Sequence, residues 1–535
     1  MHAILAAAVA SAALPCDPVY LPKRSLQLGP QGAVCQCNAS YCDSVEPVGE
    51  VPKAGFVAYT TSLHNDTERL SRSEGRLEAS PSASAKQHVE VNVSASFQKI
   101  TGFGAAFTDA ATLAYNALAP ASRAALLRSY WGKGGLDYTI GRIPIGSTDF
   151  STRVYSYNDE QFVRPGVEDL NLTHFSVGVD ESSGKLPMIR AALNRSAGLR
   201  FFGSCWAPPA WMTTGNTTLN AVLRDQAGGP VHKAYARYLS KFVSAYRERG
   251  VEIWAITGGN EPAGNTGKWQ DLKFSAAQQR DFVKLDLGPT LRAEQPGCKL
   301  MILDDQRSHL PAWADTVLGD AEAAQFVDGI GVHWYTAVED TLDFFPRLQR
   351  THESHPSVFI LGTEACEGFL PWSAGPFPGD WDRGERYALD VLGDLNHMAV
   401  GWTDWNCVLD RSGGPNWAEN ECDAPILVDV EHSASAAAGS VASFFKQPMY
   451  YYFGHVTAFV APGATRLAAA ASASSILAGP PLVAAAFLSP DGGRVVVVVM
   501  NRHGAAHETA VHVPPHGYIN VEMAAHSIRT FVLER

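Results

Sequence analysis

Two glutamates, Glu261 and Glu364, each follow a short apolar segment of the chain. Glu261 lies in VEIWAITGGNEP at residues 251–262, and Glu364 lies in SVFILGTEAC at residues 357–366. β-Branched and aromatic residues that end abruptly in polar or turn-forming residues indicate a buried strand that leads into a loop. We therefore expect each carboxyl group at the tip of a strand. One proton donor and one nucleophile or base are what cleavage of a glycosidic bond requires.

A glutamate that only caps a strand or pairs with an arginine would give the same local pattern. The surrounding elements must therefore distinguish a catalytic role from a structural one. Strand-like segments alternate here with longer amphipathic ones. The eight expected strands are 99–107, 138–144, 199–206, 251–257, 299–304, 327–334, 358–363 and 400–405, and the expected helices include 121–131, 232–249 and 276–294. This alternation predicts an α/β fold, a (β/α)8 TIM barrel, whose active site lies at the C-terminal ends of the strands.

Polar and aromatic residues gather at the ends of the expected strands. In strand order they are Arg142 and Asp149; Trp206; Asn260 and Glu261; Asp304, Asp305 and Gln306; His333, Trp334 and Tyr335; Glu364; and Asp404, Trp405 and Asn406. The interior of a barrel is filled mainly by branched apolar side chains, and charged residues are seldom buried without a partner. The pattern therefore favours a sugar-binding site at this end of the barrel over structural caps.

The remaining segments predict two further domains. Residues 49–96 and 461–535 are strand-like, and the turn SPDGGR between two apolar runs is typical of a β-hairpin, so we expect these segments to form one β-sandwich. The catalytic barrel would then comprise 97–407 with 441–460. Residues 16–48 with 408–440 would form a small disulfide-bearing β-sheet domain. Within it, the Ala/Ser-rich segment 433–443 is expected to be a flexible surface loop.

Composition limits the possible partners. The chain has 535 residues, is 46% hydrophobic and 18% charged, and has a formal net charge of −12. An acidic chain argues against nucleic acid as a partner and against electrostatic docking on anionic membranes. No segment has about 20 uninterrupted apolar residues, so no transmembrane anchor is expected.

Two features predict entry into the secretory pathway. Residues 1–15, MHAILAAAVASAALP, resemble a signal peptide, although no Lys or Arg precedes the apolar core. Six N-x-S/T sequons mark expected glycosylation sites. They lie at Asn38, Asn65, Asn92, Asn171, Asn194 and Asn216.

Four of the nine cysteines fall near the N-terminus, at positions 16, 35, 37 and 42. Four cysteines allow three pairings, and a Cys-x-Cys spacing is too tight for an ordinary bridge, so Cys35 and Cys37 should have different partners. Cys407 and Cys422 could form a further bridge. Cys205, Cys298 and Cys366 are expected to be free.

Ordered motifs along the chain closely resemble the lysosomal acid β-glucosidases of glycoside hydrolase family 30, which hydrolyse glucosylceramide. The motifs are GFGAAFTDAA, RIPIGSTDFS, WAPPAWM, WAITGGNEP, LDDQR, VHWY, TEAC, WDRG, GWTDWN, GGPNW and KQPMYYYFGH. The N-terminal VCQCNASYCDS is similar to that family as well, so the resemblance runs from about Cys16 to the C-terminus. It implies the pairing Cys16–Cys35 and Cys37–Cys42.

The resemblance also implies roles for individual residues. Glu261 matches a general acid/base and Glu364 a nucleophile, which together imply a retaining double displacement through a covalent glucosyl-enzyme. Asp149, Trp206, Asn260, Trp405 and Asn420 match residues that bind the substrate. Arg142, Tyr335 and Gln306 match supporting positions. No metal and no cofactor are expected, because no C-x-x-C occurs and the H-x-x-x-H spacings fall only in the strand-like C-terminal tail.

Two loops depart from the family pattern and leave the aglycone open. The segment AGNTGKWQDLKF after Glu261 is shorter, with Trp269 as a possible aglycone-facing aromatic, and the segment before WDRG also diverges. The alternatives are therefore a steryl glucoside or a β-glucan as substrate, or a catalytically silent sugar-binding protein. The expected partners are a glycolipid at a membrane surface and a lipid-presenting activator protein. The expected location is a lysosome or equivalent acidic compartment, or outside the cell.

Overall fold

Eight parallel strands form a closed barrel, as the sequence predicts. The strands are β6 (Gly102–Ala106), β7 (Ile140–Ile145), β8 (Arg200–Cys205), β9 (Ile253–Thr257), β10 (Lys299–Gln306), β11 (Gly329–His333), β12 (Phe359–Glu364) and β13 (Gly401–Asp404). Strands that follow one another in the chain are neighbours in the sheet, β13 pairs with β6, and a parallel bridge between Ile360 and Ala399 closes the ring. The computed structural model describes residues 15–535 except 25, 160–167, 266, 336–343 and 473–481, so the expected signal segment lies almost wholly outside the described residues.

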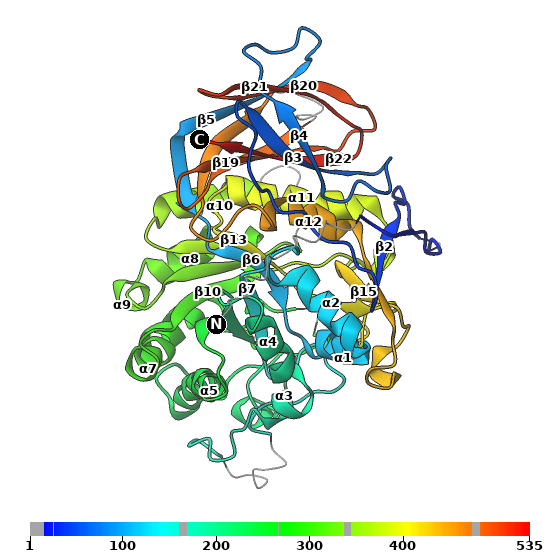
Figure 1. Ribbon diagram of the computed structural model, residues 1–535. Coiled ribbons are helices and arrows are strands. Elements are labelled where there is room, and N and C mark those ends of the chain that lie inside the picture. The colour runs from blue at the N-terminus through cyan, green and yellow to red at the C-terminus, as the bar shows by residue number, and fades with distance from the viewer. Residues whose placement is uncertain (1–14, 25, 160–167, 266, 336–343, 473–481) are drawn as a thin grey trace, which may run out of the picture.

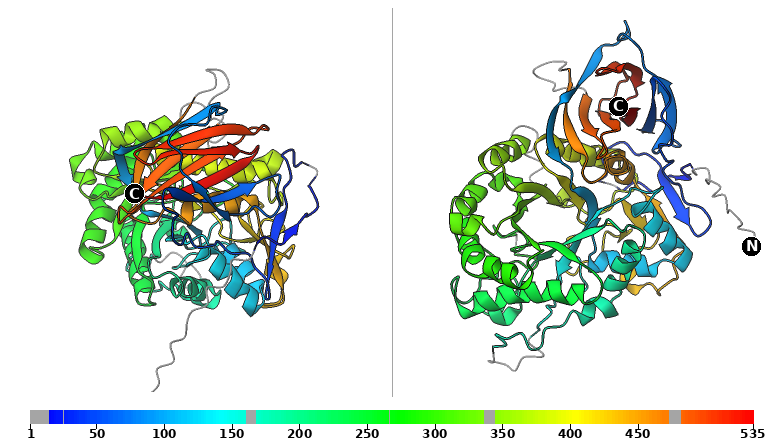
Figure 2. Two further views of the ribbon diagram at one scale, coloured as in Figure 1. Left: turned by 45° about the horizontal axis from the view of Figure 1, so that its top comes forward. Right: turned by 60° about the vertical axis from the view of Figure 1, so that its left-hand side comes forward.

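Helices surround the strands, as the end-on view in Figure 2 (right) shows. They are α1 (Asp109–Ala117), α2 (Pro120–Tyr130), α3 (Gly178–Ser182), α4 (Lys185–Leu193), α5 (Pro230–Arg247), α6 (Ala276–Phe282), α7 (Gly288–Glu294), α8 (Ala312–Leu318), α9 (Ala321–Ala324), α10 (Phe344–Ser354), α11 (Trp381–Asn396) and α12 (Pro448–Thr457). The helix expected over 276–294 has that extent, but a π-helical turn, Val283–Leu287, separates α6 from α7. The turn precedes Pro289, whose ring would clash with the carbonyl of residue 285 in a regular helix.

The β-sandwich domain combines segments from both ends of the chain in one nine-stranded sheet. Its strands are β3 (Gly55–Ser62), β4 (Ser71–Arg76), β5 (Gln87–Lys99), β17 (Thr465–Ala471), β18 (Leu482–Leu488), β19 (Arg494–Asn501), β20 (His507–Val513), β21 (Gly517–Met523) and β22 (Ser527–Glu534). The expected hairpin is the antiparallel pair β18–β19. Figure 1 shows α11 and α12 between this domain and the barrel.

A third, five-stranded sheet packs beside the barrel. It contains β1 (Pro18–Val19), β2 (Val34–Asn38), β14 (Leu409–Asp410), β15 (Ile426–Val428) and β16 (Ser443–Lys446). Because β16 pairs with β2, the sheet extends beyond the 408–440 segment expected for it. The segment expected to be a flexible loop is anchored at its start, since the backbone N–H and the hydroxyl of buried Ser433 both donate to Asp410 Oδ2 at 2.8 and 2.9 Å.

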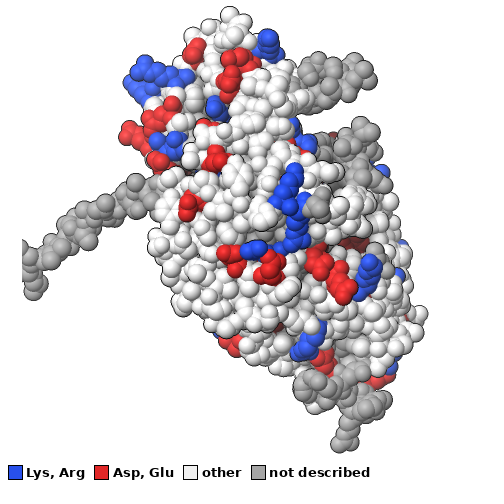
Figure 3. Space-filling view, turned by 90° about the vertical axis from the view of Figure 1, so that its right-hand side faces the viewer, with Lys and Arg blue, Asp and Glu red and all other residues white. Residues whose placement is uncertain are grey.

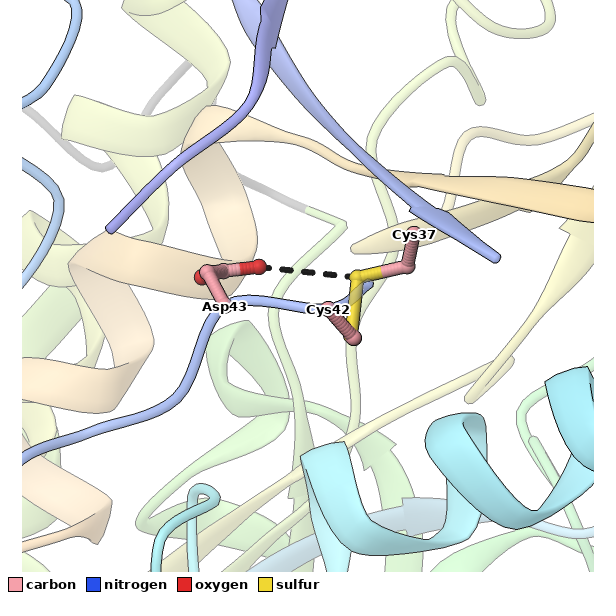
Figure 4. A group of neighbouring side chains, drawn as sticks. All are labelled: Cys37, Cys42 and Asp43. Atoms are coloured by element: carbon pink, nitrogen blue, oxygen red, sulfur yellow. Dashed lines mark hydrogen bonds between the residues drawn. A yellow bond between two sulfur atoms is a disulfide. The ribbon is translucent and has the colours of Figure 1, made fainter. Parts of the chain in front are cut away.

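Two disulfides, Cys16–Cys35 and Cys37–Cys42, secure the small sheet. Asp43 Oδ1 lies 3.5 Å from Cys37 Sγ (Figure 4). Although these three side chains cluster at metal-like distances, sulfur atoms joined in a disulfide carry no thiolate for a metal ion. Asp43 is instead paired with the buried Lys446 ammonium at 3.0 Å, which ties the segment after Cys42 to β16 of the same sheet.

The other five cysteines, including Cys407 and Cys422, are free and buried. The possible Cys407–Cys422 bridge is therefore not formed. Cys407 packs in the large core cluster of the molecule, whereas Cys422 packs in a separate cluster with Trp206 and Trp405.

The surface has no dominant sign of charge on the face shown in Figure 3, where acidic and basic side chains are interspersed among uncharged ones. Among the described residues, no helix has the length and apolar character needed to cross a bilayer.

Candidate active site

Strands β9 and β12 bring the two glutamates together at the C-terminal end of the barrel. Glu364 is the last residue of β12, and Glu261 lies four residues beyond the end of β9. One carboxylate oxygen of each glutamate and one ring nitrogen of His333 all lie within 4.8 Å of one another. Retaining glycosidases hold their two carboxyl groups about 5–5.5 Å apart and inverting enzymes about 6.5–9.5 Å apart. The nearest oxygens of Glu261 and Glu364 therefore lie closer together than the carboxyl groups of the inverting class.

The backbone holds Glu261 in an uncommon conformation. Its φ is 46°, in the left-handed region that side-chain-bearing residues seldom adopt. The Glu261 N–H donates to the Asp304 carbonyl at 2.9 Å, and Asn260 N–H donates to the Cys205 carbonyl at 2.8 Å. These bonds tie the loop after β9 to the strands on either side of it. They compensate the backbone strain at Glu261 and fix the direction of its carboxyl group.

Arg142, on β7, lies beneath the pair and is fully buried. Its guanidinium donates to Glu364 Oε2, to Asp304 Oδ2 at 3.0 Å and to Asn260 Oδ1 at 2.7 Å. Burial alone would raise the pKa of Asp304, but the charge of Arg142, with His333 and Ser204, holds it well below its usual range. Asp304 is therefore ionised, and it compensates the buried guanidinium.

His333, at the end of β11, connects the carboxyl groups. Its Nδ1 lies 3.2 Å from Glu261 Oε1 and 4.0 Å from Glu364 Oε1, and its Nε2 lies 3.1 Å from Asp304 Oδ1. Burial alone would lower the pKa of His333, but the charge of Glu364 and the hydrogen bonds to Asp304 and Glu261 raise it to about 10. Both ring nitrogens then carry protons, so the cluster of Glu261, His333 and Glu364 favours a proton over a metal ion, which needs a free imidazole nitrogen.

Glu364 accepts a further hydrogen bond from the Tyr335 hydroxyl at 2.9 Å. Burial raises the pKa of Glu364, His333 and Arg142 lower it, and the neighbouring Glu261 raises it again. Two carboxyl groups this close compete for a proton, because each negative charge disfavours the other.

A cavity of about 380 Å³ opens over the pair. Trp206 and Trp405 lie stacked in its wall, with ring centroids 4.8 Å apart. Asn420 Nδ2 donates to Asp149 Oδ2 at 3.0 Å, and burial raises the pKa of Asp149 to about 7. Aromatic faces beside paired polar groups are suited to the faces and hydroxyls of a sugar ring.

The expected substrate-binding residues, Asp149, Trp206, Asn260, Trp405 and Asn420, all line this cavity with both glutamates. Tyr335 and Gln306 line it too, and Gln306 Nε2 donates to Glu261 Oε1 at 3.0 Å. Trp269, from the shortened loop, is also in the wall. Arg142 lies behind the wall and reaches Glu364 from below.

The sequence placed Asp304 and His333 among the polar residues at the strand ends without giving them individual roles, and it did not select Phe369 at all. Asp304 and His333 stand at strand ends, which is the signal that could have selected them. Phe369 comes from a divergent loop and lines both this cavity and a second one of about 320 Å³. Three exposed side chains in the wall of the second cavity are apolar: Leu26, Leu28 and Trp372, which are 59%, 93% and 63% exposed.

Comparisons with known proteins identify the same architecture. The family model described as "Glycosyl hydrolase family 30 TIM-barrel domain" matches residues 100–460, and the "Glycosyl hydrolase family 30 beta sandwich domain" matches residues 463–531. A Caenorhabditis elegans protein named putative glucosylceramidase 4 is 41% identical over 82% of this chain and 81% of its own length. The lysosomal acid glucosylceramidase of Mus musculus is 38% identical over 85% of this chain and 84% of its own.

A more distant relative is an endo-1,6-β-D-glucanase of Neurospora crassa, 28% identical over 69% of this chain and 71% of its own length. Among solved structures, SrfJ from Salmonella typhimurium shares the fold with a TM-score of 0.78 at 24% identity, covering 90% of this chain and all of SrfJ. The chain therefore belongs to glycosyl hydrolase family 30 and is a glycoside hydrolase.

Proposed function

We propose that this protein hydrolyses glucosylceramide to glucose and ceramide with retention of anomeric configuration. The observation that carries the proposal is the pair Glu261 and Glu364, whose nearest oxygens lie within 4.8 Å on one sugar-sized cavity. The relatives named glucosylceramidases, which match over four-fifths of the chain, support the substrate.

In the first step, Glu364 acts as the nucleophile and Glu261 as the acid. Glu261 Oε1 accepts from Gln306 and faces His333 Nδ1, so the acid proton is placed on Oε2. Glu261 gives this proton to the glycosidic oxygen as the bond to the aglycone breaks. Glu364 forms the new bond to the anomeric carbon, supported from below by Arg142 and Tyr335.

In the second step, water replaces the aglycone. Glycosylation removes the charge of Glu364, so the ionised Glu261 no longer faces a second carboxylate and takes a proton from the water. Attack of the water on the anomeric carbon releases glucose and regenerates Glu364.

Recognition of the glucose ring is assigned to the residues around the pair. Asn260 accepts from Arg142 through Oδ1, which leaves its amide hydrogens to donate to the sugar 2-hydroxyl. Asp149, fixed by Asn420, accepts from further hydroxyls. Trp206 and Trp405 provide the apolar faces.

The apolar rim, formed by Leu26, Leu28 and Trp372, favours a lipid aglycone over a glucan chain. Leu26, Leu28 and Trp372 are exposed beside the second cavity, which meets the glucose cavity at Phe369. Exposed leucines beside a tryptophan are suited to acyl chains or a membrane surface, and charged side chains such as Asp382 and Arg386 line the same cavity. The glucanase relative keeps a β-glucan as the second candidate substrate.

The proposed location is the secretory pathway, ending in a lysosome or equivalent acidic compartment, where a lipid-presenting activator protein would assist access to the substrate. The mouse relative carries the lysosomal name. Five of the six sequon asparagines are exposed and Asn38 is half-buried, so glycans can be accommodated.

Trapping the nucleophile with a 2-deoxy-2-fluoro-β-glucosyl fluoride tests the proposal. Mass spectrometry of the digested protein should place the sugar on Glu364, and the Glu364→Gln variant should remain unlabelled. Parallel assays with glucosylceramide and a β-1,6-glucan decide the substrate. An adduct with glucan cleavage and no ceramide release would move the substrate to a glucan, and a folded protein without adduct or hydrolysis would overturn the proposal.

A further inference from the structure

Two free thiols, Cys366 and Cys422, lie together in the wall of the active-site cavity. They come from different segments: Cys366 follows Glu364 by two residues, and Cys422 follows Asn420 by two residues. Both side chains are 1% exposed, and the two thiols are in hydrogen-bonding contact. Neither has a role in the proposed hydrolysis.

The backbone already holds the two segments side by side. Asp423 N–H donates to the Glu367 carbonyl at 2.7 Å, so the residues that follow the two cysteines are directly bonded. Trp334 Nε1–H donates to the Cys366 carbonyl at 3.1 Å and fixes that backbone from below. Paired backbones and hydrogen-bonded thiols bring the two sulfur atoms together, and such proximity is the first requirement for a disulfide.

The two thiols are not equivalent. Burial raises the pKa of both, and the hydrogen bond between them raises that of Cys366 but lowers that of Cys422. Of the two thiols, Cys422 is the one that ionises more readily. Attack by a thiolate on a disulfide is the usual route to a new bridge, so Cys422 is the attacking group and Cys366 the resolving one.

We propose that Cys366 and Cys422 form a thiol-modification site that reacts with low-molecular-weight disulfides entering through the cavity, and that the resulting bridge suppresses hydrolysis. The Cys422 thiolate attacks one sulfur of the small disulfide and expels the other half as a thiolate. That thiolate takes the Cys366 proton, and Cys366 then displaces the second half from Cys422. Two protein thiols are oxidised to one bridge, and one small disulfide is reduced to two small thiols.

The bridge would act on both sides of the site. The Tyr335 hydroxyl lies 3.5 Å from Cys366 Sγ and 2.9 Å from Glu364 Oε1, so movement of Cys366 displaces a hydrogen-bond partner of Glu364. Movement of Cys422 pulls on the segment that holds Asn420 against Asp149. Small displacements of positioned groups lower rates strongly, and a chain that already holds two disulfides is suited to an oxidising compartment.

The test treats the full-length protein, with its two native disulfides intact, with hydroxyethyl disulfide at mildly alkaline pH, where more of the buried thiols ionise. The five free thiols should fall by two, and peptide mapping should link Cys366 to Cys422. Hydrolysis of an aryl β-glucoside should fall at least about tenfold and recover with dithiothreitol. An iminosugar bound in the cavity should slow bridge formation, because it blocks the entry path.

Cys422→Val should prevent the bridge and the loss of activity on treatment with the disulfide. The activity of the treated variant is compared with that of the same variant before treatment. The matched control is Cys298→Ser, which removes a buried free thiol outside this cavity wall and should behave as the parent does. Mass spectrometry and the thiol count detect the bridge directly. Bridge formation is therefore tested separately from the proposed hydrolase activity. An unchanged thiol count, a bridge between other cysteines, or a Cys366–Cys422 bridge with full activity would each overturn the proposal.

Discussion

His333 Nδ1 lies 3.2 Å from Glu261 Oε1, so a buried imidazolium faces the carboxyl group to which we assign the acid/base role. The same ring reaches Asp304 through Nε2 at 3.1 Å. Because Arg142 pairs with Asp304 and Glu364, two cations and three carboxyl groups form one continuous buried network. The charge of His333 therefore lowers the pKa of Glu364.

Replacing His333 with Asn should lower kcat/KM about 100-fold and shift its pH profile. The charge of His333 lowers the pKa of Glu364, so its loss raises that pKa further. The acid limb of the kcat/KM profile, which reports ionisation of the nucleophile, should then move to higher pH. A purely structural role would lower activity at every pH without moving the limb. His397→Asn, in a histidine that does not line the cavity, is the matched control.

The two glutamates should be distinguishable by azide rescue. Glu261→Ala should lose about 10²–10⁴-fold in rate on substrates with poor leaving groups and much less on a dinitrophenyl glucoside, which leaves without protonation. Azide should accelerate this variant and give the β-glucosyl azide, because Glu364 still forms the intermediate. Glu364→Ala should be nearly inactive, and azide should give the α-glucosyl azide by direct displacement. Identical azide products from both variants would contradict the assigned roles.

Much of this arrangement was predictable from the sequence. Parallel barrel strands are buried on both faces and appear as continuous apolar runs, which is why β9 and β12 lie where the patterns around Glu261 and Glu364 place them. The π turn before Pro289 was not predicted, because amphipathic spacing continues through it. Nor was β16, whose place depends on pairing with β2 some 400 residues earlier in the chain.

The network around His333 could not be predicted for a related reason. Arg142, Asp304 and His333 come from three different strands, and each alone is a polar residue at a strand end. Their contacts exist only after the barrel closes and fixes the register between strands. The Cys366–Cys422 contact likewise joins two segments that are far apart in the sequence, whereas spacing along the chain suggested Cys407 as the partner of Cys422.

Removing the apolar rim should affect lipid and soluble substrates differently. Trp372→Ala and Leu28→Ser should each lower hydrolysis of glucosylceramide in vesicles about tenfold, because each removes apolar area available to the lipid. Hydrolysis of a water-soluble aryl glucoside should change far less. Leu285→Ser, at a leucine 48% exposed and outside both cavities, is the control. Equal losses on both substrates would show that the rim supports the fold and does not contact the lipid.

Several buried carboxyl groups should make the protein more stable on the acid side of neutrality. Burial raises the pKa of Asp149 and of Asp305 to about 7, and that of Glu385 to about 8. A carboxyl group with a raised pKa binds its proton more tightly in the folded state, so its contribution to stability is lost as the pH rises through the folded pKa. His333, raised to about 10, acts in the same direction above its unfolded value. The unfolding free energy should therefore fall between about pH 6.5 and about pH 8.

Glu385 separates this effect from catalysis, because it lies on α11 and outside the cavity. Its carboxyl group lies 3.0 Å from His526 Nδ1 and 3.8 Å from Arg502. Glu385→Gln mimics the protonated acid. It should therefore reduce the fall of the unfolding free energy with pH by as much as about 1.4 kcal/mol per pH unit, which is the slope for one proton. Glu252→Gln, at a surface side chain that is 74% exposed, should leave the decline unchanged. Chemical denaturation at the two pH values measures both variants, and a parent stability that is flat or rising over this range would contradict the argument.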